Sequence, residues 1–302
     1  VDEEADSQDV FYPGLVRVLT YSLFLRAPRF SLGLDDDYKD ERLQRFLQQM
    51  DHYDLVLLQE VAGVFSSRRE QMLTSMAAQG FNRMNCHASD TDIWPTFLFD
   101  SGLLLMSRLP MVHKAEVKFL PGIHLDRLWA RGALYAKLRL GQDGPFMHVC
   151  TTQFQSTASE ENFSQACDVR RAQIAELTSK LKKIIEEVDG GSRQWPLLLG
   201  GNLNVNGRRS SVDSTHSAEY CCLVDLLQDE LGTLRDLLHD SCGAHPVTYA
   251  DVRLTGRGEV PAERVLTAQV AQENNFFQRQ RLDYLFFFPQ AGHCGERIVP
   301  AT

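Results

Sequence analysis

The feature that most constrains the fold is a set of short, strongly apolar segments, each of which has polar residues at one end. Asp54–Gln59 (DLVLLQ) leads into Glu60, and Pro196–Leu199 leads into Gly200–Asn204 (GGNLN). Arg281–Phe288 (RLDYLFFF) carries its polar residues at its start. Apolar runs of this length are typical of buried strands and are much shorter than the roughly 20 residues of a membrane helix. The sequence therefore predicts a buried sheet with polar side chains gathered at strand ends.

Amphipathic segments lie between these runs and predict helices that cover the sheets. Lys39–Asp51 places Leu43, Phe46, Leu47 and Met50 on one helical face. The other predicted helices are Ser67–Gln79, Asp168–Glu187, Tyr220–Leu227 and Leu234–Leu238. The other predicted strands are Leu15–Phe24, Leu103–Met106, Ala133–Leu140 and Met147–Thr152. Arg208–Ser217 and Asp251–Asn275 are predicted to be irregular, because they are rich in Ser, Gly and polar residues.

Two of the predicted strands follow each other without a helix between them, which indicates mixed or antiparallel sheets and not a pure βαβ fold. Two sheets packed face to face, with helices outside, suit a chain of 302 residues. We therefore expect one domain over residues 11–302 after an acidic tail at residues 1–10, with a C-terminal end that is truncated or degenerate.

The net charge and the cysteines limit the class of binding partner and the cellular compartment that we expect. The net charge of −9 argues against a nucleic-acid partner, because phosphate backbones select basic surfaces. Lys180, Lys182 and Lys183 are interpreted as a solvated helix face. Seven cysteines without a CxxC pair favour reduced thiols and an intracellular protein. No apolar run is long enough to span a membrane, and a removed N-terminal segment is compatible with a chain that begins at Val1.

Six groups of polar or small residues stand at predicted strand ends, which is where α/β folds place their sites. They are Thr20-Tyr21-Ser22, Gln59-Glu60-Val61, Ser101-Gly102, Thr152-Gln153-Phe154-Gln155, Gly200-Gly201-Asn202-Leu203-Asn204 and Arg281-Leu282-Asp283-Tyr284. Each group alone is a weak signal, whereas their order and spacing together are specific.

This ordered set resembles the endonuclease/exonuclease/phosphatase superfamily over nearly the whole chain. SGLLLMSRLP at residues 101–110, RGALYAKLRL at residues 131–140 and His245-Pro246-Val247-Thr248 are similar to its neutral sphingomyelinase branch. The resemblance implies a deoxyribonuclease-like α/β fold, a four-layer sandwich of two packed mixed or antiparallel sheets flanked by helices. It also implies hydrolysis of phosphodiesters with Mg²⁺, an ion that takes hard oxygen ligands.

Three positions keep the residues that the resemblance implies. Glu60 stands where the family holds its metal ion, and the alternative is a surface carboxylate after a strand. Asn204 matches the second polar residue of the family's GDxN motif, and the alternative is an ordinary loop residue. Asp283 stands where the family has an Asp that orients a catalytic His. A buried Asp needs a partner, which supports a site, although a purely structural hydrogen bond is the alternative.

Three other positions depart from the family. Ser22 replaces an Asn that helps to position metal and water, Gln153 replaces a His, and Asn202 replaces the Asp that activates water. A second family His lies in an SDH motif that is expected shortly after the last strand, and the sequence reaches Thr302 without it. His293 is interpreted as a loop residue. Neither Gln153 nor Asn202 can transfer a proton near neutral pH, and the loss of one such group typically slows catalysis by roughly 10²–10⁴.

Three functions remain open on these residues. The first is a catalytically inactive domain that serves as a structural or binding subunit of a protein complex, with Mg²⁺ weakly bound or absent. The second is an active Mg²⁺-dependent phosphodiesterase that acts on sphingomyelin or a related phospholipid. The third is a phospholipid head-group module that uses Arg131 and the membrane-touching segment Trp94–Phe99 (WPTFLF). For Arg131 the alternative is a surface salt bridge, and for Trp94–Phe99 it is core packing.

Overall fold

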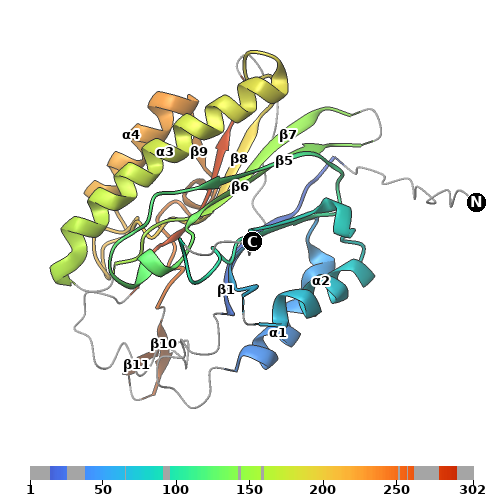
Figure 1. The fold of residues 1–302 in the computed structure, drawn as a ribbon. Coiled ribbons are helices and arrows are strands. Elements are labelled where there is room, and N and C mark those ends of the chain that lie inside the picture. The colour runs from blue at the N-terminus through green and yellow to red at the C-terminus, as the bar shows by residue number, and fades with distance from the viewer. Residues whose placement is uncertain are drawn as a thin grey trace, which may run out of the picture.

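The computed structural model of the chain describes residues 14–25, 38–64, 66–90, 96–141, 144–157, 160–250, 252–256, 258–261 and 279–290. In these residues two large sheets pack against each other, and helices cover both outer faces (Figure 1). The predicted four-layer α/β sandwich is therefore confirmed. Residues 1–10 and His293 lie outside the described residues.

The smaller of these two sheets has the order β1-β2-β4-β3. Its strands are β1 (Val18–Leu25), β2 (Leu55–Val61), β4 (Leu104–Ser107) and β3 (Cys86–Ala88). Strand β1 runs parallel to β2, and the other pairs are antiparallel. The helices α1 (Lys39–Leu47) and α2 (Arg68–Ala78) cover its outer face (Figure 1).

The larger sheet has the order β5-β6-β7-β8-β12-β9. Its strands are β5 (Met111–Lys118), β6 (Gly132–Arg139), β7 (Phe146–Gln153), β8 (Leu197–Asn202), β12 (Asp283–Phe288) and β9 (Arg235–Asp236). The helices α3 (Phe163–Asp189) and α4 (Ala218–Leu231) cover its outer face, and the short α5 (Leu237–Cys242) follows β9. A hairpin of β10 (Val252–Thr255) and β11 (Gly258–Pro261) forms a separate two-stranded sheet.

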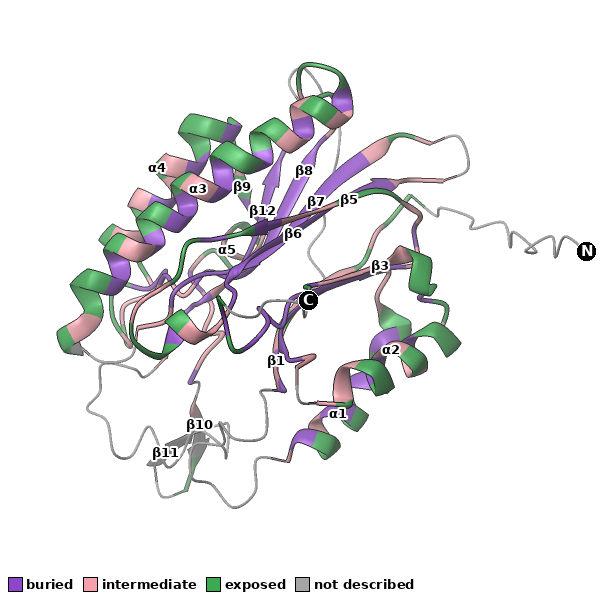
Figure 2. Cartoon of the chain, in the orientation of Figure 1, coloured by how far each residue is buried: buried purple, intermediate pink, exposed green. Residues whose placement is uncertain are grey.

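Apolar side chains fill each interface between the layers, and this explains why the central strands are apolar on both faces. Leu57, Leu105, Ala136, Leu198 and Leu285 belong to the core between the two sheets. The central strands of both sheets are accordingly buried, whereas the helices alternate buried and exposed residues (Figure 2). The polar ends of β7, β8 and β2 lie at one edge of this apolar core.

Most predicted elements are confirmed, with three differences. The predicted helix Leu234–Leu238 is wrong at its start, because Arg235 and Asp236 pair with Phe287 and Phe286 of β12 before α5 begins. The segment Asp251–Asn275 contains the β10–β11 hairpin and is thus not wholly irregular, although residues 262–275 lie outside the described residues. Strands β3 and β5 were not predicted, because β3 has three residues and β5 is largely exposed on an edge.

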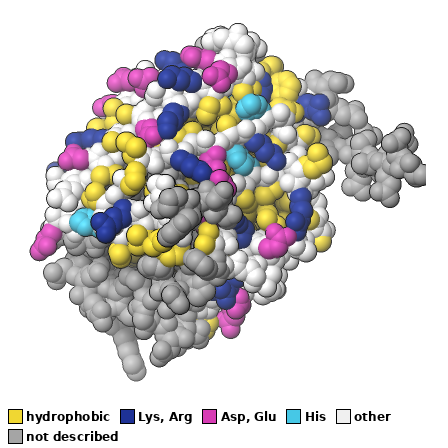
Figure 3. Space-filling view, in the orientation of Figure 1, with side chains coloured by type: hydrophobic (Ala, Val, Ile, Leu, Met, Phe, Trp, Pro, Cys, Tyr) yellow, Lys and Arg dark blue, Asp and Glu magenta, His cyan; other side chains and the backbone are white. Residues whose placement is uncertain are grey.

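The described surface carries charges of both signs. Lys180 pairs with Glu176 over 2.6 Å, and Lys182 lies 3.7 Å from Glu230, so this face of α3 is solvated as predicted. Lys, Arg, Asp and Glu side chains are interspersed over the face shown in Figure 3. No helix in the described ranges has the length and apolar character that crossing a bilayer requires.

Candidate functional site

A row of polar side chains crosses three neighbouring strands of the larger sheet. Gln153 on β7 lies opposite Asn202 on β8, which lies opposite Asp283 on β12. Directly opposed residues on neighbouring strands point to the same face of a sheet. Strand β12 is antiparallel to β8, so the row joins the ends of β7 and β8 to the start of β12. Three segments that are distant in the sequence thereby form one polar row.

The smaller sheet presents polar residues to this row. The side chain of Gln153 donates a hydrogen bond from Nε2 to Oε1 of Glu60 over 2.9 Å. Asn202 donates from Nδ2 to Oγ of Ser22 over 3.2 Å, and Ser22 in turn donates to Oε1 of Gln59 over 3.3 Å. Ser22, Glu60, Gln153, Asn202 and Asp283 therefore come together between the two sheets, as the motifs predict.

The backbone at Glu60 has a conformation that non-glycine residues rarely adopt. Its φ is +61°, in the left-handed region, where a side chain other than Gly is strained. Gly102 packs against this point with a φ of +66°, and a Cβ at Gly102 would lie 2.9 Å from the backbone N of Val61 and 3.1 Å from Cα of Glu60. The Ser101-Gly102 motif is therefore needed for the backbone that aims the Glu60 carboxylate.

Asp283 is the titratable group of the row. Burial, together with the charge of Glu60, raises its pKa from 3.8 to about 6, against the opposing effect of the nearby Thr248 and Ser22 hydroxyls. Its Oδ1 is buried and has no hydrogen-bond partner among the described residues. An ordinary structural Asp would have both oxygens satisfied, so this atom indicates a ligand-binding position.

Asn204 follows the row but does not direct its side chain into it. The backbone N–H of Asn204 donates to Oδ1 of Asn202 over 3.0 Å, and its own Nδ2 donates to the carbonyl of Phe154 over 2.8 Å. Its φ of +51° suits Asn, which adopts this region more readily than most residues. In this structure Asn204 shapes the loop after β8, and its catalytic role stays a prediction.

Arg131 is buried next to the row and is already paired. It directly precedes Gly132, which lies opposite Gln153. Its Nη2 donates to Oδ1 of Asp126 over 3.0 Å, whereas its Nε is buried without a hydrogen bond to any described residue. Burial would raise the pKa of Asp126, but Arg131 and Ser156 hold it below the usual range. Arg131 is thus in a buried ion pair and not on the surface, and one guanidinium N–H remains for an anion.

The aromatic segment predicted as either membrane-touching or core-packed is split. Phe97 and Phe99 are buried, and Leu98 between them is 44% exposed. Trp94 and Pro95 lie outside the described residues. The described part of this segment therefore packs into the protein through its two phenylalanines.

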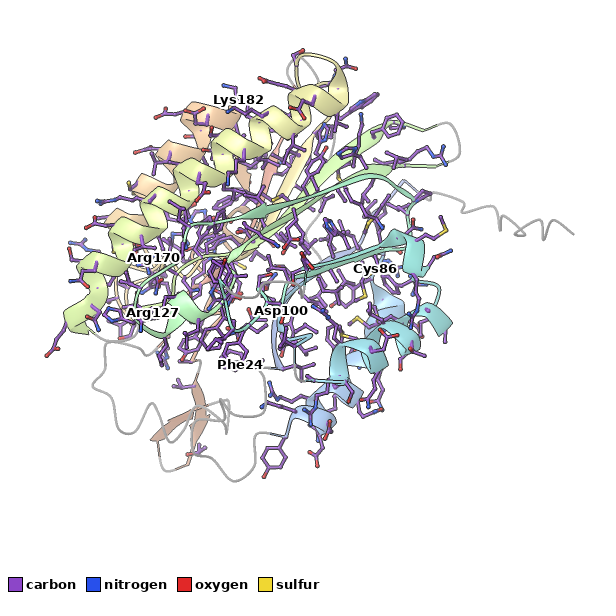
Figure 4. The ribbon with its side chains drawn as sticks, viewed as in Figure 1. Phe24, Cys86, Asp100, Arg127, Arg170 and Lys182 are labelled. Atoms are coloured by element: carbon purple, nitrogen blue, oxygen red, sulfur yellow. The ribbon has the colours of Figure 1, made fainter. Side chains whose placement is uncertain are left out.

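Sequence reasoning missed Asp100, which supports the loop after Glu60. Its buried carboxylate accepts hydrogen bonds from the backbone N of Gly63 over 3.1 Å and from Nη1 of Arg69 over 2.7 Å. Figure 4 labels Asp100 near the centre of the view. The sequence signal that could have indicated Asp100 is its position directly before Ser101-Gly102.

The oxygen atoms of the site fit a magnesium ion. Burial and, beside it, the charge of Glu60 raise the pKa of the Asp283 carboxyl. Oε1 of Gln153 and Oδ1 of Asp283 are both buried without hydrogen-bond partners among the described residues. Carboxylate and amide oxygens are the hard ligands that Mg²⁺ takes, and a cation would offset the repulsion between the carboxylates.

Comparisons with known proteins agree with this geometry. No protein-family model matches the chain. A sphingomyelinase of Dictyostelium discoideum is 28% identical over 267 residues, which cover 78% of this chain and 57% of the relative's length. The chain thus spans little more than half of that protein.

Solved structures show the same fold at lower sequence identity. Sphingomyelinase C from Streptomyces griseocarneus has a TM-score of 0.62 at 20% identity, covering 93% of this chain and 85% of its own. A double mutant of beta toxin from Staphylococcus aureus, solved with bound magnesium ions, has a TM-score of 0.64 at 16% identity, covering 90% and 83%. The sequence relatives and the shared fold support a resemblance to the sphingomyelinase-like branch of the endonuclease/exonuclease/phosphatase superfamily.

Proposed function

We propose that this chain is a catalytically inactive sphingomyelinase-like domain that keeps a divalent-cation site and serves as a binding or structural subunit. The observation that carries the proposal is the hydrogen bond from Gln153 to Glu60 over 2.9 Å. Gln153 stands where the family resemblance implies a His. Its amide fixes the carboxylate but cannot give or take a proton near neutral pH.

The rest of the row supports the same proposal. Asn202 donates its amide hydrogen to Ser22, so the group at the position of the water-activating Asp is neither negative nor basic. Because Ser22, Gln153 and Asn202 are all uncharged, the proton chemistry that the resemblance implies has no carrier at these positions. Losses within one constellation do not add simply, yet each alone typically slows turnover by roughly 10²–10⁴.

Cation binding does not need these proton carriers. Glu60 and Asp283, with the amide oxygen of Gln153, would hold Mg²⁺, which when bound supplies positive charge for a phosphate group. Arg131 directly precedes Gly132, which lies opposite Gln153, and its Nε–H has no hydrogen bond to the described residues and offers an anion a further donor. A phosphate head group of a lipid is the ligand chemistry that this arrangement favours, and a protein partner within a larger complex is compatible with it.

Hydrolysis and cation binding must be measured on the same protein. We expect wild type and Glu60→Gln to hydrolyse sphingomyelin and bis-p-nitrophenyl phosphate at the same background rate with Mg²⁺. Isothermal titration calorimetry should at the same time show Mg²⁺ binding that Glu60→Gln weakens. Hydrolysis at enzymatic rates that is lost in Glu60→Gln would overturn the proposal of an inactive domain.

The raised pKa of Asp283 favours a second candidate function, an active phosphodiesterase with an altered mechanism. A carboxylate with a pKa of about 6 can accept a proton near neutral pH, as catalytic bases often do. In that case hydrolysis would rise with pH through about 6 and would vanish in Asp283→Asn. A flat pH profile at background level excludes this candidate.

Lipid binding is tested separately from turnover. Liposome flotation with and without choline head groups measures whether the chain recognises them, and Arg131→Lys should weaken any recognition because Lys lacks the planar fork of donors. Arg127→Lys is the matched control, because Arg127 is exposed on the same short helix region, residues 124–128. Equal flotation with and without choline lipids would contradict head-group recognition.

A further inference from the structure

Three histidines gather on the far side of β12 from the small sheet, outside the site described above. His216 precedes α4, His239 lies in α5 and His245 follows α5. Their ring centroids are 4.8–4.9 Å apart, and one nitrogen from each ring lies within 4.8 Å of one from each of the others. Three segments therefore bring three imidazoles to one point.

The ring of His245 is held in a fixed orientation. Nη1 of Arg281 contacts its Nδ1 over 2.7 Å, and its Nε2 lies 2.7 Å from Nδ1 of His216. A guanidinium only donates hydrogen bonds, so Nδ1 of His245 is an acceptor and the proton of the neutral ring is on Nε2. Gly207 leaves the space for this ring, because a Cβ there would lie 2.9 Å from Nδ1 of His245.

The positive charge of Arg281 beside the cluster is offset by the carboxylate of Asp236. Arg281 is paired with Oδ1 of Asp236 over 2.5 Å, and the hydroxyl of Tyr220 donates to the other oxygen of Asp236 over 2.8 Å. Nδ1 of His245 accepts a hydrogen bond from Arg281, which a protonated imidazole could not do, so this ring is neutral. A neutral imidazole is the form that binds metal ions.

The kind of metal follows from the ligands. Imidazole nitrogens suit Zn²⁺, Co²⁺, Ni²⁺ and Cu²⁺, whereas Mg²⁺ takes oxygen ligands. His216 is exposed, His239 is half-buried and His245 is buried, so the cluster opens to solvent on one side. Three protein ligands with one open side are the arrangement that leaves a coordination position for water or another group.

We propose that His216, His239 and His245 bind one divalent transition-metal ion, independently of the Glu60–Asp283 site. On binding, the lone pairs of Nδ1 of His216 and Nε2 of His245 go to the metal, so the 2.7 Å contact between these two nitrogens is replaced by two bonds to the ion. The proton of Nε2 moves to Nδ1 of the same ring, which stays neutral, and Arg281 gives up its contact with Nδ1 while it keeps Asp236. Metal binding therefore requires Arg281 to move away from His245.

The test uses tag-free protein titrated with Co²⁺ and Zn²⁺. We expect saturable binding of one ion per chain, with the visible absorption of nitrogen-coordinated Co²⁺. His216→Gln and His239→Gln should each weaken binding by at least about tenfold, because even outer partners of metal ligands contribute that much. His52→Gln, an exposed histidine in the short helix Met50–His52, is the matched control and should bind as wild type does.

Further measurements separate this site from the proposed Mg²⁺ site and from ring packing alone. Glu60→Gln should bind Zn²⁺ as wild type does, and excess Mg²⁺ should not displace it. The proposal is overturned if wild type binds no ion saturably, if both histidine variants bind as wild type does, or if electron paramagnetic resonance of bound Cu²⁺ shows oxygen ligands alone.

Discussion

The amide of Gln153 on β7 donates a hydrogen bond to Oε1 of Glu60 on β2, over 2.9 Å, and so links the two sheets at the candidate cation site. The same contact fixes the amide orientation, with Oε1 of Gln153 left buried and unpaired among the described residues. Gln153 thus binds and orients the Glu60 carboxylate, and its amide does not exchange protons near neutral pH.

Restoring the missing proton carriers should create activity. We expect the double variant Gln153→His/Asn202→Asp to hydrolyse phosphodiesters with Mg²⁺, while each single variant stays near background, because the two groups act together and each contributes roughly 10²–10⁴. Initial rates on bis-p-nitrophenyl phosphate measure this. Adding Glu60→Gln to the double variant should return the rate to background, and activity that persists would not belong to this site.

The pKa of Asp283 predicts how stability depends on pH. The folded chain holds the Asp283 proton up to about pH 6, whereas the unfolded chain releases it near 3.8. A raised pKa means that the folded state binds more protons between these values, so the free energy of unfolding falls as pH rises from about 4 to 6, by about 3 kcal/mol from this residue. The free energy of unfolding of Asp283→Asn should not fall in this way. Urea unfolding should therefore show the variant becoming more stable than wild type as pH rises over the same range.

A matched variant and added Mg²⁺ check the assignment to Asp283. Asp229→Asn, at an exposed position of α4, should follow the wild-type pH dependence. Mg²⁺ should reduce the loss in wild type above pH 6, because a bound cation favours the ionised carboxylate. Parallel curves for Asp283→Asn and wild type would contradict the raised pKa.

Replacing Gly102 by Ala should destabilise the protein more than the same replacement at Gly190, which also has a positive φ. Gly102→Ala and Gly190→Ala both place a Cβ at positive φ, +66° and +77°, which costs about 1–2 kcal/mol. Gly190 has open space around it, whereas at Gly102 the Cβ meets the backbone of Glu60 and Val61. We expect Gly102→Ala to lower the free energy of unfolding by about 1–3 kcal/mol more than Gly190→Ala. Equal losses, measured by urea unfolding, would show that the close contact has no energetic effect.

Arg170 supports the segment that follows Gln153, and its replacement should destabilise the protein. This fully buried guanidinium on α3 (Figure 4) donates to Glu219 over 2.7 Å and to the carbonyl of Gln155 over 3.0 Å. Arg170→Leu leaves Glu219 without this partner and should cost about 3–5 kcal/mol. Arg171→Leu, at the exposed neighbouring position, should change stability by less than about 0.5 kcal/mol. Thermal unfolding of both variants compares them directly.

The strands and the polar residues at their ends could be predicted because they depend on local pattern. DLVLLQ and RLDYLFFF are apolar on both faces and short, which is typical of central strands. The site residues on β1, β2, β7, β8 and β12 then followed from motif order. Strand β9 could not be predicted, because its two residues are strand only through pairing with Phe286 and Phe287 of β12.

The contacts that hold the His245 ring and the Glu60 backbone could not be predicted either, because they join residues that are distant in the sequence. Arg281 bonds to His245, 36 residues away, and to Asp236, 45 residues away, and no local pattern encodes either pair. The left-handed backbone of Glu60 likewise depends on Gly102, which another strand connection brings against it. Sequence predicts which residues reach the site, and the tertiary structure decides what each one contacts.

The strained backbone of Glu60 has a consequence for the kinetics and entropy of ligand association. Its φ of +61°, the packing of Gly102 and the bond from Gln153 immobilise the carboxylate when the chain folds. A ligand that arrives later meets a group that is already preorganised, so association loses little side-chain entropy and needs no rearrangement before contact. The strain of holding that carboxylate lowers the stability of the folded chain. The rate of diffusional encounter, and not a conformational change, then limits the rate of cation binding.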